Sequence, residues 1–485
     1  MSRAAELSFT RTVGRSALLL AALACGACGD DATPALSMRI VTPAGLDPRA
    51  AGSLERIVVR VRETPPGALP RDVVVLEGDA NADFALDYAL SSTASRIDVG
   101  IELTGPGARL IGAAAPFVPN ETDGVVDVLV APPSSCAVRA GALSTARGAA
   151  QATRLGSYAL FVGGAPAGSA AAAQIELVDL LGARASVADA LIIGGAPFEV
   201  AAADVIALST RSALLLLRDR DAALHYDLDA AAAVRSTAIL VHMGARGGTL
   251  AARLTGGAAI VGGVDAAGAP LADITWIATD GSTTRGTLSV ARRQPAVLAL
   301  ADGVLLVAGG AETPGAPLFE RIAEVAASAP LAGTDDDQIR RGGALVPVAA
   351  TGGALLLGGL DGAGAIRTDA RIFDDCPGAC TLVETAALTD ALRVDTTIAV
   401  LPTEGALLLG GRDGSGAPID AAWHVTLAPT APRLQLVARS RLPAPRAAPA
   451  ALVLPSGLVW LAAGVNASGP TSDLQVCFPA ALALP

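Results

Sequence analysis

Lysine is missing from this 485-residue sequence, so all 35 basic residues are arginine, and 46 acidic residues outnumber them. The formal net charge of −11 argues against a nucleic-acid partner, which would require a basic surface. Histidine, tyrosine and tryptophan occur three times each, which leaves few side chains for metal binding or acid–base chemistry. No apolar run after the N-terminus approaches the roughly 20 residues that a membrane-spanning helix needs.

The N-terminus has the pattern of an export signal. Arg3, Arg11 and Arg15 precede an uncharged, leucine-rich stretch over residues 16–24 that ends in small residues. A basic region, a short apolar region and small residues at the cleavage point are typical of a signal peptide, which we place at residues 1–24.

The cysteine directly after this stretch resembles the signal of bacterial lipoproteins. Neither Cys25 nor Cys28 has a leucine three residues before it, which that signal prefers. The resemblance implies lipidation of Cys25, with Cys28 as the alternative, and a short tether over residues 25–36. Acyl chains would hold the exported protein on a membrane of the cell envelope, by expectation the outer membrane. Plain secretion is the other possibility.

Residues 37–133 alternate charged and apolar side chains with a period of two, which is typical of half-buried strands. The segments are 56–62, 72–76, 96–101 and 125–130. Glycine and proline separate them at intervals that favour an immunoglobulin-like β-sandwich, with the charged side chains on its solvated face.

From residue 134 onward, an apolar run ending in a glycine pair recurs at intervals of about 50 residues. The runs lead to Gly163, Gly262, Gly309, Gly358 and Gly410, and a degenerate copy ends in Ala463-Gly464. One interval is twice as long, and the apolar run 214–217 fills the gap. This gives seven copies. A further pair, Gly194-Gly195, lies outside the period and is expected to end an outer strand.

An arginine lies about 17 residues before most of the glycine pairs. These are Arg147, Arg246, Arg292, Arg341, Arg393 and Arg446. We expect one structural arginine in each repeat. The alternative is a ring of arginines that binds anions on one face.

Repeats of this length that end a strand in Gly-Gly resemble the kelch family of β-propellers. The resemblance implies an all-β protein with a propeller over residues 134–480, in which each repeat forms one four-stranded blade. Seven blades are expected, with six or eight as alternatives. Kelch blades usually carry a tyrosine and a tryptophan after the glycines, and here only Trp276 and Trp423 remain as candidates.

Some kelch-like propellers are copper oxidases, which use a radical tyrosine, a cross-linked cysteine and two histidine ligands. His225, His242 and His424 are not spaced as metal ligands, and no tyrosine follows Tyr226. We therefore predict no metal site and no cofactor.

Acidic turns after the glycine pairs, at 361–364 and 413–416, could suggest calcium loops. Each has one aspartate, whereas calcium takes several oxygen ligands, and Asp-Gly is a favoured turn dipeptide. We expect ordinary turns there and a solvated loop at the acidic residues 334–337.

The four remaining cysteines are expected to form two disulfides, because exported proteins retain them. Cys136 precedes the first repeat and Cys477 lies in the last strand, so a bridge between them would close the ring of blades. Cys376 and Cys380 would pair across a tight turn.

These observations favour a non-catalytic binding or interaction lipoprotein of the cell envelope, with an unidentified protein or glycan partner. The first alternative is an enzyme, for example one acting on polysaccharide through paired carboxylates on the channel face. The second is a structural surface protein.

Overall fold

The structure is a computed structural model. It describes residues 5–11, 19–25, 36–42, 54–79, 86–88, 95–119, 122, 125–164, 174–182, 187–193, 196–200, 203–217, 222–228, 234–241, 249–252, 256–300, 304–323, 329–331, 338–348, 351–376, 380–402, 405–428, 433–438, 441–480 and 483. Their regular elements are forty strands, β1 to β40, so the all-β class is confirmed. No helix in these ranges is long and apolar enough to cross a membrane.

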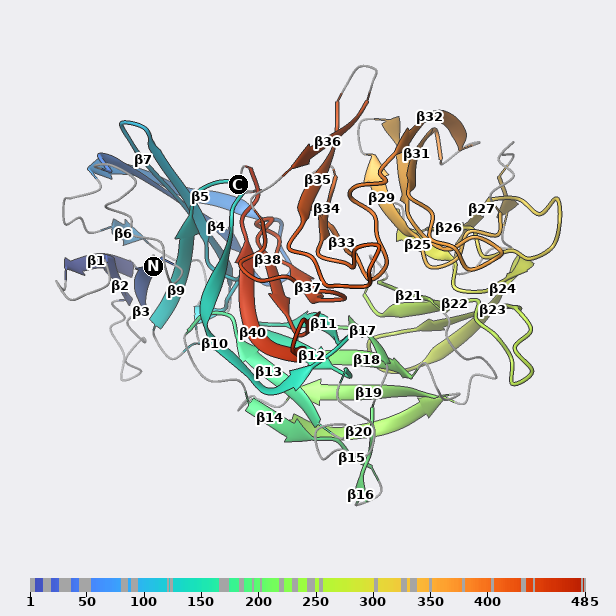
Figure 1. Ribbon diagram of the computed structural model, residues 1–485. Coiled ribbons are helices and arrows are strands. Elements are labelled where there is room, and N and C mark those ends of the chain that lie inside the picture. The colour runs from blue at the N-terminus through green and yellow to red at the C-terminus, as the bar shows by residue number, and fades with distance from the viewer. Residues whose placement is uncertain are drawn as a thin grey trace.

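Seven antiparallel sheets form the blades of a propeller: six have four strands, and the seventh has four strands and a short fifth one (Figure 1). Blades 1 to 3 consist of β11 (Gln151–Leu155), β12 (Tyr158–Val162), β13 (Gln174–Asp179) and β14 (Val187–Ala190); β17 (Ala203–Ala207), β18 (Ser212–Leu217), β19 (Ala223–Leu228) and β20 (Val234–Val241); and β21 (Thr249–Ala252), β22 (Ala258–Val261), β23 (Leu271–Ile277) and β24 (Thr283–Arg292). The gap-filling apolar run 214–217 is the buried second strand of blade 2, as the sequence predicted.

Blades 4 to 6 have the same order. They consist of β25 (Ala296–Ala299), β26 (Leu305–Ala308), β27 (Phe319–Ile322) and β28 (Ala329–Pro330); β29 (Ala344–Val348), β30 (Gly353–Leu357), β31 (Asp369–Asp374) and β32 (Thr381–Ala387); and β33 (Thr397–Val400), β34 (Ala406–Leu409), β35 (Ala422–Leu427) and β36 (Leu434–Ala438). The second strand of each is fully buried, because it lies between two strands and between two neighbouring blades.

Blade 7 closes the ring by combining both ends of the propeller. Its strands are β37 (Ala450–Val453), β38 (Val459–Ala462), β40 (Gly469–Cys477) and, outermost, β10 (Cys136–Arg147), with the short β39 (Val465–Asn466) beside β40. β10 precedes blade 1 in sequence and pairs with β40, opposite Cys477 at its Cys136 end. The predicted count of seven blades is confirmed, and pairing β10 with β40 gives the seventh blade its outermost strand.

The off-period pair Gly194-Gly195 lies outside the described residues, between β15 (Ile192–Ile193) and β16 (Ala196–Pro197). Among the described residues, these two strands pair with each other as a separate two-stranded sheet, between blades 1 and 2 in the sequence, and they do not add a blade to the seven.

The N-terminal region forms one mixed sheet, where the sequence suggested an immunoglobulin-like sandwich. Its order is β5-β4-β7-β8-β9-β3-β2-β1-β6, and β3 runs parallel to β9. The strands are β1 (Ala5–Arg11), β2 (Leu19–Cys25), β3 (Leu36–Val41), β4 (Arg56–Thr64), β5 (Arg71–Asp79), β6 (Leu86–Tyr88), β7 (Arg96–Gly105), β8 (Ala108–Ala113) and β9 (Val125–Ala131). The expected alternation is present, since burial in β4 changes at every residue.

A second sheet is not needed because the apolar side of this sheet has another partner. One hydrophobic core contains Ile57 and Val128 of the sheet together with Phe161 of blade 1 and Trp460 of blade 7. The sheet therefore packs against the first and last blades instead of a facing sheet.

The predicted signal peptide coincides with β1 and β2, and β6 pairs only with β1. Removal of residues 1–24 would leave β3 as the edge strand of a six-stranded sheet. Residues 26–35 of the predicted tether lie outside the described part of the chain.

The first glycine of the pair in blade 4 has a steric role that can be tested. Gly309 has φ +69°, and a Cβ there would lie 2.2 Å from the Arg340 carbonyl oxygen. Gly315 has nearly the same φ, +74°, but open space around it. We expect Gly309→Ala to lower the free energy of unfolding by about 1–3 kcal/mol more than Gly315→Ala does. Urea unfolding measures this difference, and equal losses would show that φ alone requires the glycine.

Candidate functional site

Four arginines are buried where one blade passes into the next, and three of them belong to the predicted series. Arg147, Arg292, Arg340 and Arg446 are each at most 1% exposed. We call them the interblade arginines, because each has partners in the blade that follows it. The sequence left two roles open, a structural one and a ring that binds anions. Burial favours the structural role for these four arginines, since side chains without access to solvent cannot bind anions from it.

Arg292 shows the arrangement most fully. Its carbonyl oxygen accepts a hydrogen bond of 2.9 Å from Gly263 N in blade 3. Its guanidinium donates to the Gly309 carbonyl (2.6 Å) and to Glu320 Oε1 (2.8 Å), both in blade 4. The second oxygen of Glu320 accepts from the backbone N–H of Ser289, on the outermost strand of blade 3. One arginine thus joins two blades through both its backbone and its side chain.

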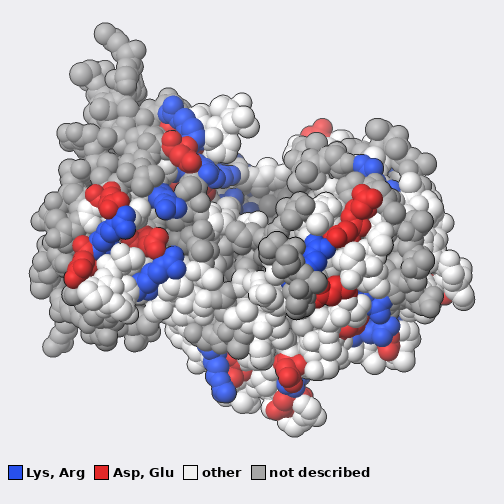
Figure 2. All heavy atoms as spheres, turned by 90° about the horizontal axis from the view of Figure 1, so that it is seen from above, with Lys and Arg blue, Asp and Glu red and all other residues white. Residues whose placement is uncertain are grey.

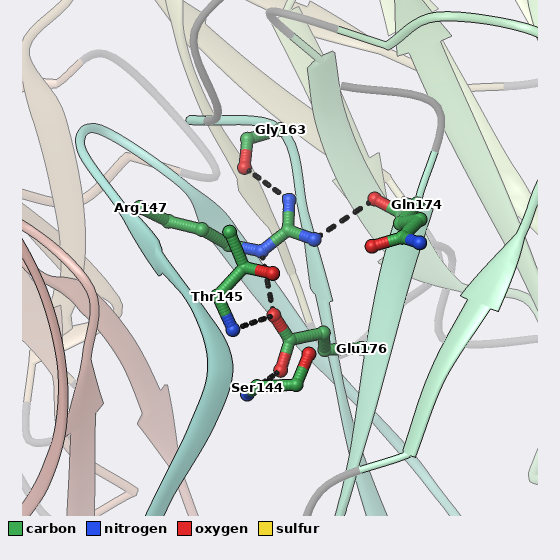
Figure 3. A network of polar contacts seen from close by, with 6 residues as sticks. All are labelled: Ser144, Thr145, Arg147, Gly163, Gln174 and Glu176. Atoms are coloured by element: carbon green, nitrogen blue, oxygen red, sulfur yellow. Dashed lines mark hydrogen bonds and ion pairs between the residues drawn. The ribbon is translucent and has the colours of Figure 1, made fainter. Parts of the chain in front are cut away.

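The same network links the first and last blades (Figure 3). Arg147, at the end of β10, donates to Glu176 Oε1 (3.0 Å) and to the carbonyl oxygens of Gly163 and Gln174 in blade 1. Glu176 in turn accepts from the backbone N–H of Ser144 on β10. Since β10 belongs to blade 7, these bonds hold the closing strand against blade 1.

Burial affects the ionisation of these groups. It lowers the pKa of Arg292, although Glu320 opposes the shift, and it lowers the pKa of Arg446 against the opposing charge of Asp473. Burial alone would raise the pKa of Asp369, but hydrogen bonds from Arg371 and Arg340 outweigh it and lower that pKa.

The sequence assigned two of these positions incorrectly. In blade 5 the buried arginine is Arg340, and the predicted Arg341 points to the surface with 20% of its side chain exposed. In blade 6 Arg393 is only half-buried, and the Thr396 hydroxyl donates to the Gly410 carbonyl instead. The predicted Arg246 lies outside the described residues.

The carboxylate partners were not predicted. Glu176, Glu320, Asp369 and Asp473 lie 29, 28, 29 and 27 residues after their arginines, on the third strands of their blades. This nearly constant interval is visible in the sequence and could have identified them.

The exposed face at the glycine-pair ends of the strands carries a series of similar turns. They are 265–268, 313–316, 361–364, 413–416 and 466–469, in blades 3 to 7, and we call them the turn rim. In blade 5, one oxygen of Asp361 accepts from the backbone N–H groups of Ala363 and Ala365, both at 2.9 Å. Asp265 and Asp413 make the same pair of bonds. The prediction of ordinary turns agrees with this, because these oxygens bind the backbone of their own turn.

Charges on the surface are paired rather than gathered by sign. In the view of Figure 2, basic and acidic side chains of the described residues lie next to one another. Near the turn rim, Arg412 pairs with Asp395 at 2.7 Å and Arg293 with Glu312 at 2.8 Å.

The histidines that the sequence singled out lie in different blades. His225 is on β19 of blade 2, where its Nδ1 lies 3.1 Å from Asp227, and His424 is on β35 of blade 6. His242 and the acidic residues 334–337 lie outside the described residues. Among the described residues, no group of three or more His, Cys, Asp and Glu side chains could hold a metal ion.

Both expected disulfides are present. Cys136 is bonded to Cys477 across β10 and β40, and Cys376 to Cys380 between β31 and β32. Cys25 is the last residue of β2, and Cys28 lies outside the described residues, so lipidation stays a prediction.

No family model and no curated protein sequence matches the chain. A fungal alcohol oxidase of the AA5 family, solved in complex with copper, is similar in structure, with a TM-score of 0.51 and 14% identity over 71% of this chain and 76% of the oxidase. A streptogramin B lyase is less similar, with a TM-score of 0.43 and 12% identity over 70% of this chain and 97% of the lyase. The protein YjhT has a TM-score of 0.39 and 10% identity over 69% of this chain and 95% of its own. At these identities the likeness concerns the fold alone, a seven-bladed propeller similar to kelch and galactose-oxidase-type propellers.

Proposed function

We propose that this protein is an exported lipoprotein of the bacterial cell envelope that presents the turn rim of its propeller to a binding partner. The observation that carries the proposal is the polarity of the fold. The N-terminal sheet contacts the propeller at the ends of strands opposite the glycine pairs, where Asp127 N of β9 donates to the Leu181 carbonyl after β13. A membrane anchor at the N-terminus would therefore leave the turn rim on the opposite side.

Beside this contact, a buried arginine joins the first and last blades, on which the sheet packs. Arg139 of β10 donates to the carbonyl oxygens of Asp179 and Gly182 in blade 1, and its guanidinium lies 4.2 Å from the centre of the Trp460 ring. Burial lowers the pKa of Arg139 to about 10, so it is still charged at neutral pH. Cation–π contact and two carbonyl acceptors compensate that buried charge.

The turns themselves suit a binding role. Each aspartate that holds its own backbone reduces the conformational entropy that a loop would lose on binding a partner. Loops carried by a rigid scaffold are the usual place for recognition. The two disulfides support export, because they persist in oxidising compartments.

Lipidation is tested by labelling cells with a fatty-acid analogue. We expect the label on the wild-type protein in the membrane fraction and its loss in the Cys25→Ala, Cys28→Ala double variant. Single variants then identify the modified cysteine. An unlabelled wild-type protein released into the medium would contradict the anchor.

The presented surface is tested in the same cells with a photo-crosslinking amino acid. It is placed at Ser415, in the turn rim, or at Leu69, which is 87% exposed on the N-terminal sheet. We expect a discrete adduct from position 415 and none from position 69. Adducts from position 69 alone, or from neither position, would contradict binding through the rim.

A further inference from the structure

Two surface arginines approach one carboxylate oxygen on the turn rim. Glu312, directly before the turn of blade 4, places its Oε1 2.8 Å from Arg293 Nε and 4.0 Å from a terminal nitrogen of Arg341. The arginines come from the connections that lead into blades 4 and 5. Two positive charges thus face one negative charge contributed by a neighbouring loop.

Both guanidiniums are fixed before any ligand arrives. Arg293 donates to the Gly268 carbonyl in the turn of blade 3, and Arg341 donates to the Asp361 carbonyl in the turn of blade 5. Their side chains are 29% and 20% exposed, against 40% for Glu312. Positioned donors lose little conformational entropy on binding an anion, so they bind it better than flexible surface side chains do.

Glu312 does not satisfy all the hydrogen-bond donors of Arg293 and Arg341. The Nε–H groups of Arg293 and Arg341 are buried, yet neither finds a hydrogen-bond acceptor among the described residues. Arg293 Nε and Glu312 are therefore close in space without the alignment of a hydrogen bond. The nearby Asp361 uses its Oδ1 within its own turn, where this oxygen accepts two backbone N–H groups.

We propose that Arg293 and Arg341 form a binding site for a carboxylate group, and that Glu312 occupies this site in the free protein. A ligand carboxylate would displace Glu312 and accept from both guanidiniums in the two-oxygen geometry that arginine favours. The carboxylate can come from a free acid or from a polymer. The inference deepens the proposed function and rests on it for the choice of face, but a titration of purified protein does not depend on lipidation.

Calorimetric titration of the full chain with glutarate tests the site. We expect Glu312→Gln to bind glutarate at least tenfold more tightly than the wild type, because the internal competitor is removed. Adding Arg341→Gln to that variant should abolish the gain. The matched control is Glu77→Gln. Glu77 forms an exposed ion pair of 2.6 Å with the single arginine Arg56, so its removal should free one guanidinium without creating a two-arginine site.

Glu312→Gln and Arg341→Gln change surface side chains, and thermal unfolding verifies that each variant is folded. No gain in the Glu312→Gln variant, an equal gain in Glu77→Gln, or a gain that survives Arg341→Gln would each overturn the proposal. Polygalacturonate at the same carboxylate concentration distinguishes the two sources. Tighter binding of the polymer supports a chain-borne carboxylate, and tighter binding of glutarate supports a free acid.

Discussion

Replacing Cys136 and Cys477 together with alanine is expected to lower the free energy of unfolding by about 5 kcal/mol, because this disulfide closes a very long loop. The two cysteines are 341 residues apart and face each other across β10 and β40. Without the bond, the unfolded chain gains the freedom of that whole loop. In the folded protein, β10 is then held to blade 7 by its pairing with β40 and to blade 1 by the Arg147 network.

The matched control is the Cys376→Ala, Cys380→Ala variant, whose cysteines are four residues apart. The same loop-entropy relation gives about 2 kcal/mol for so short a loop. Denaturant unfolding of both variants under oxidising conditions measures the difference. Equal losses would show that loop length does not determine the contribution, and unchanged stability of the long-loop variant would show that the pairing of β10 with β40 closes the ring unaided.

Glu320→Gln is expected to lower the free energy of unfolding by about 3–5 kcal/mol, the usual cost of leaving one member of a buried ion pair without its countercharge. Arg292 and Glu320 are both fully buried, so water cannot replace the lost charge. The neutral amide keeps one acceptor oxygen where the carboxylate has two. It cannot balance the guanidinium, and its NH₂ group would meet the Ser289 N–H, which now points at a carboxylate oxygen.

Asp420→Asn is the control for this variant. Asp420 pairs with Arg441 at 3.3 Å, but the arginine is 81% exposed, and exposed pairs contribute about 0–1 kcal/mol. Urea unfolding of both variants therefore separates buried pairs from exposed ones. A loss of less than 1 kcal/mol in Glu320→Gln would mean that the interblade arginines do not depend on their carboxylates.

The sequence predicted the number of blades because its signal is steric and periodic. The five repeated glycine pairs stand where backbones approach closely, and even the degenerate copy adopts the same conformation, since Ala463 has φ +58°. The disulfide partners followed from the same count, because first and last strands of a closed ring must meet.

Other features depended on information that a periodic pattern does not contain. Arg340 and Arg341 are adjacent and chemically identical, and only the path of the backbone decides which one is buried. In blade 6, a threonine hydroxyl takes over the contact with the glycine carbonyl, so the arginine there is free to stay at the surface. The carboxylates that pair with the arginines also recur at a regular interval in the sequence, but they lie on a different strand from the arginines.

The N-terminal sheet illustrates a further limit. Alternation with a period of two predicts a strand with one buried face, and the burial pattern of β4 confirms this prediction. It does not predict what covers that face. Here the cover is blades 7 and 1, which lie far away in the sequence.

The use of β10 as the outermost strand of the last blade also sets an order of events during synthesis. Cys136 leaves the ribosome 341 residues before Cys477, which at about 5–20 residues per second is a delay of about 17–68 s. During that time β10 has no strand to pair with, and Cys376 and Cys380 emerge before its correct partner does. Faithful maturation therefore requires either that Cys136 remain reduced until the C-terminus has emerged, or that an early bond to another cysteine be exchanged afterwards.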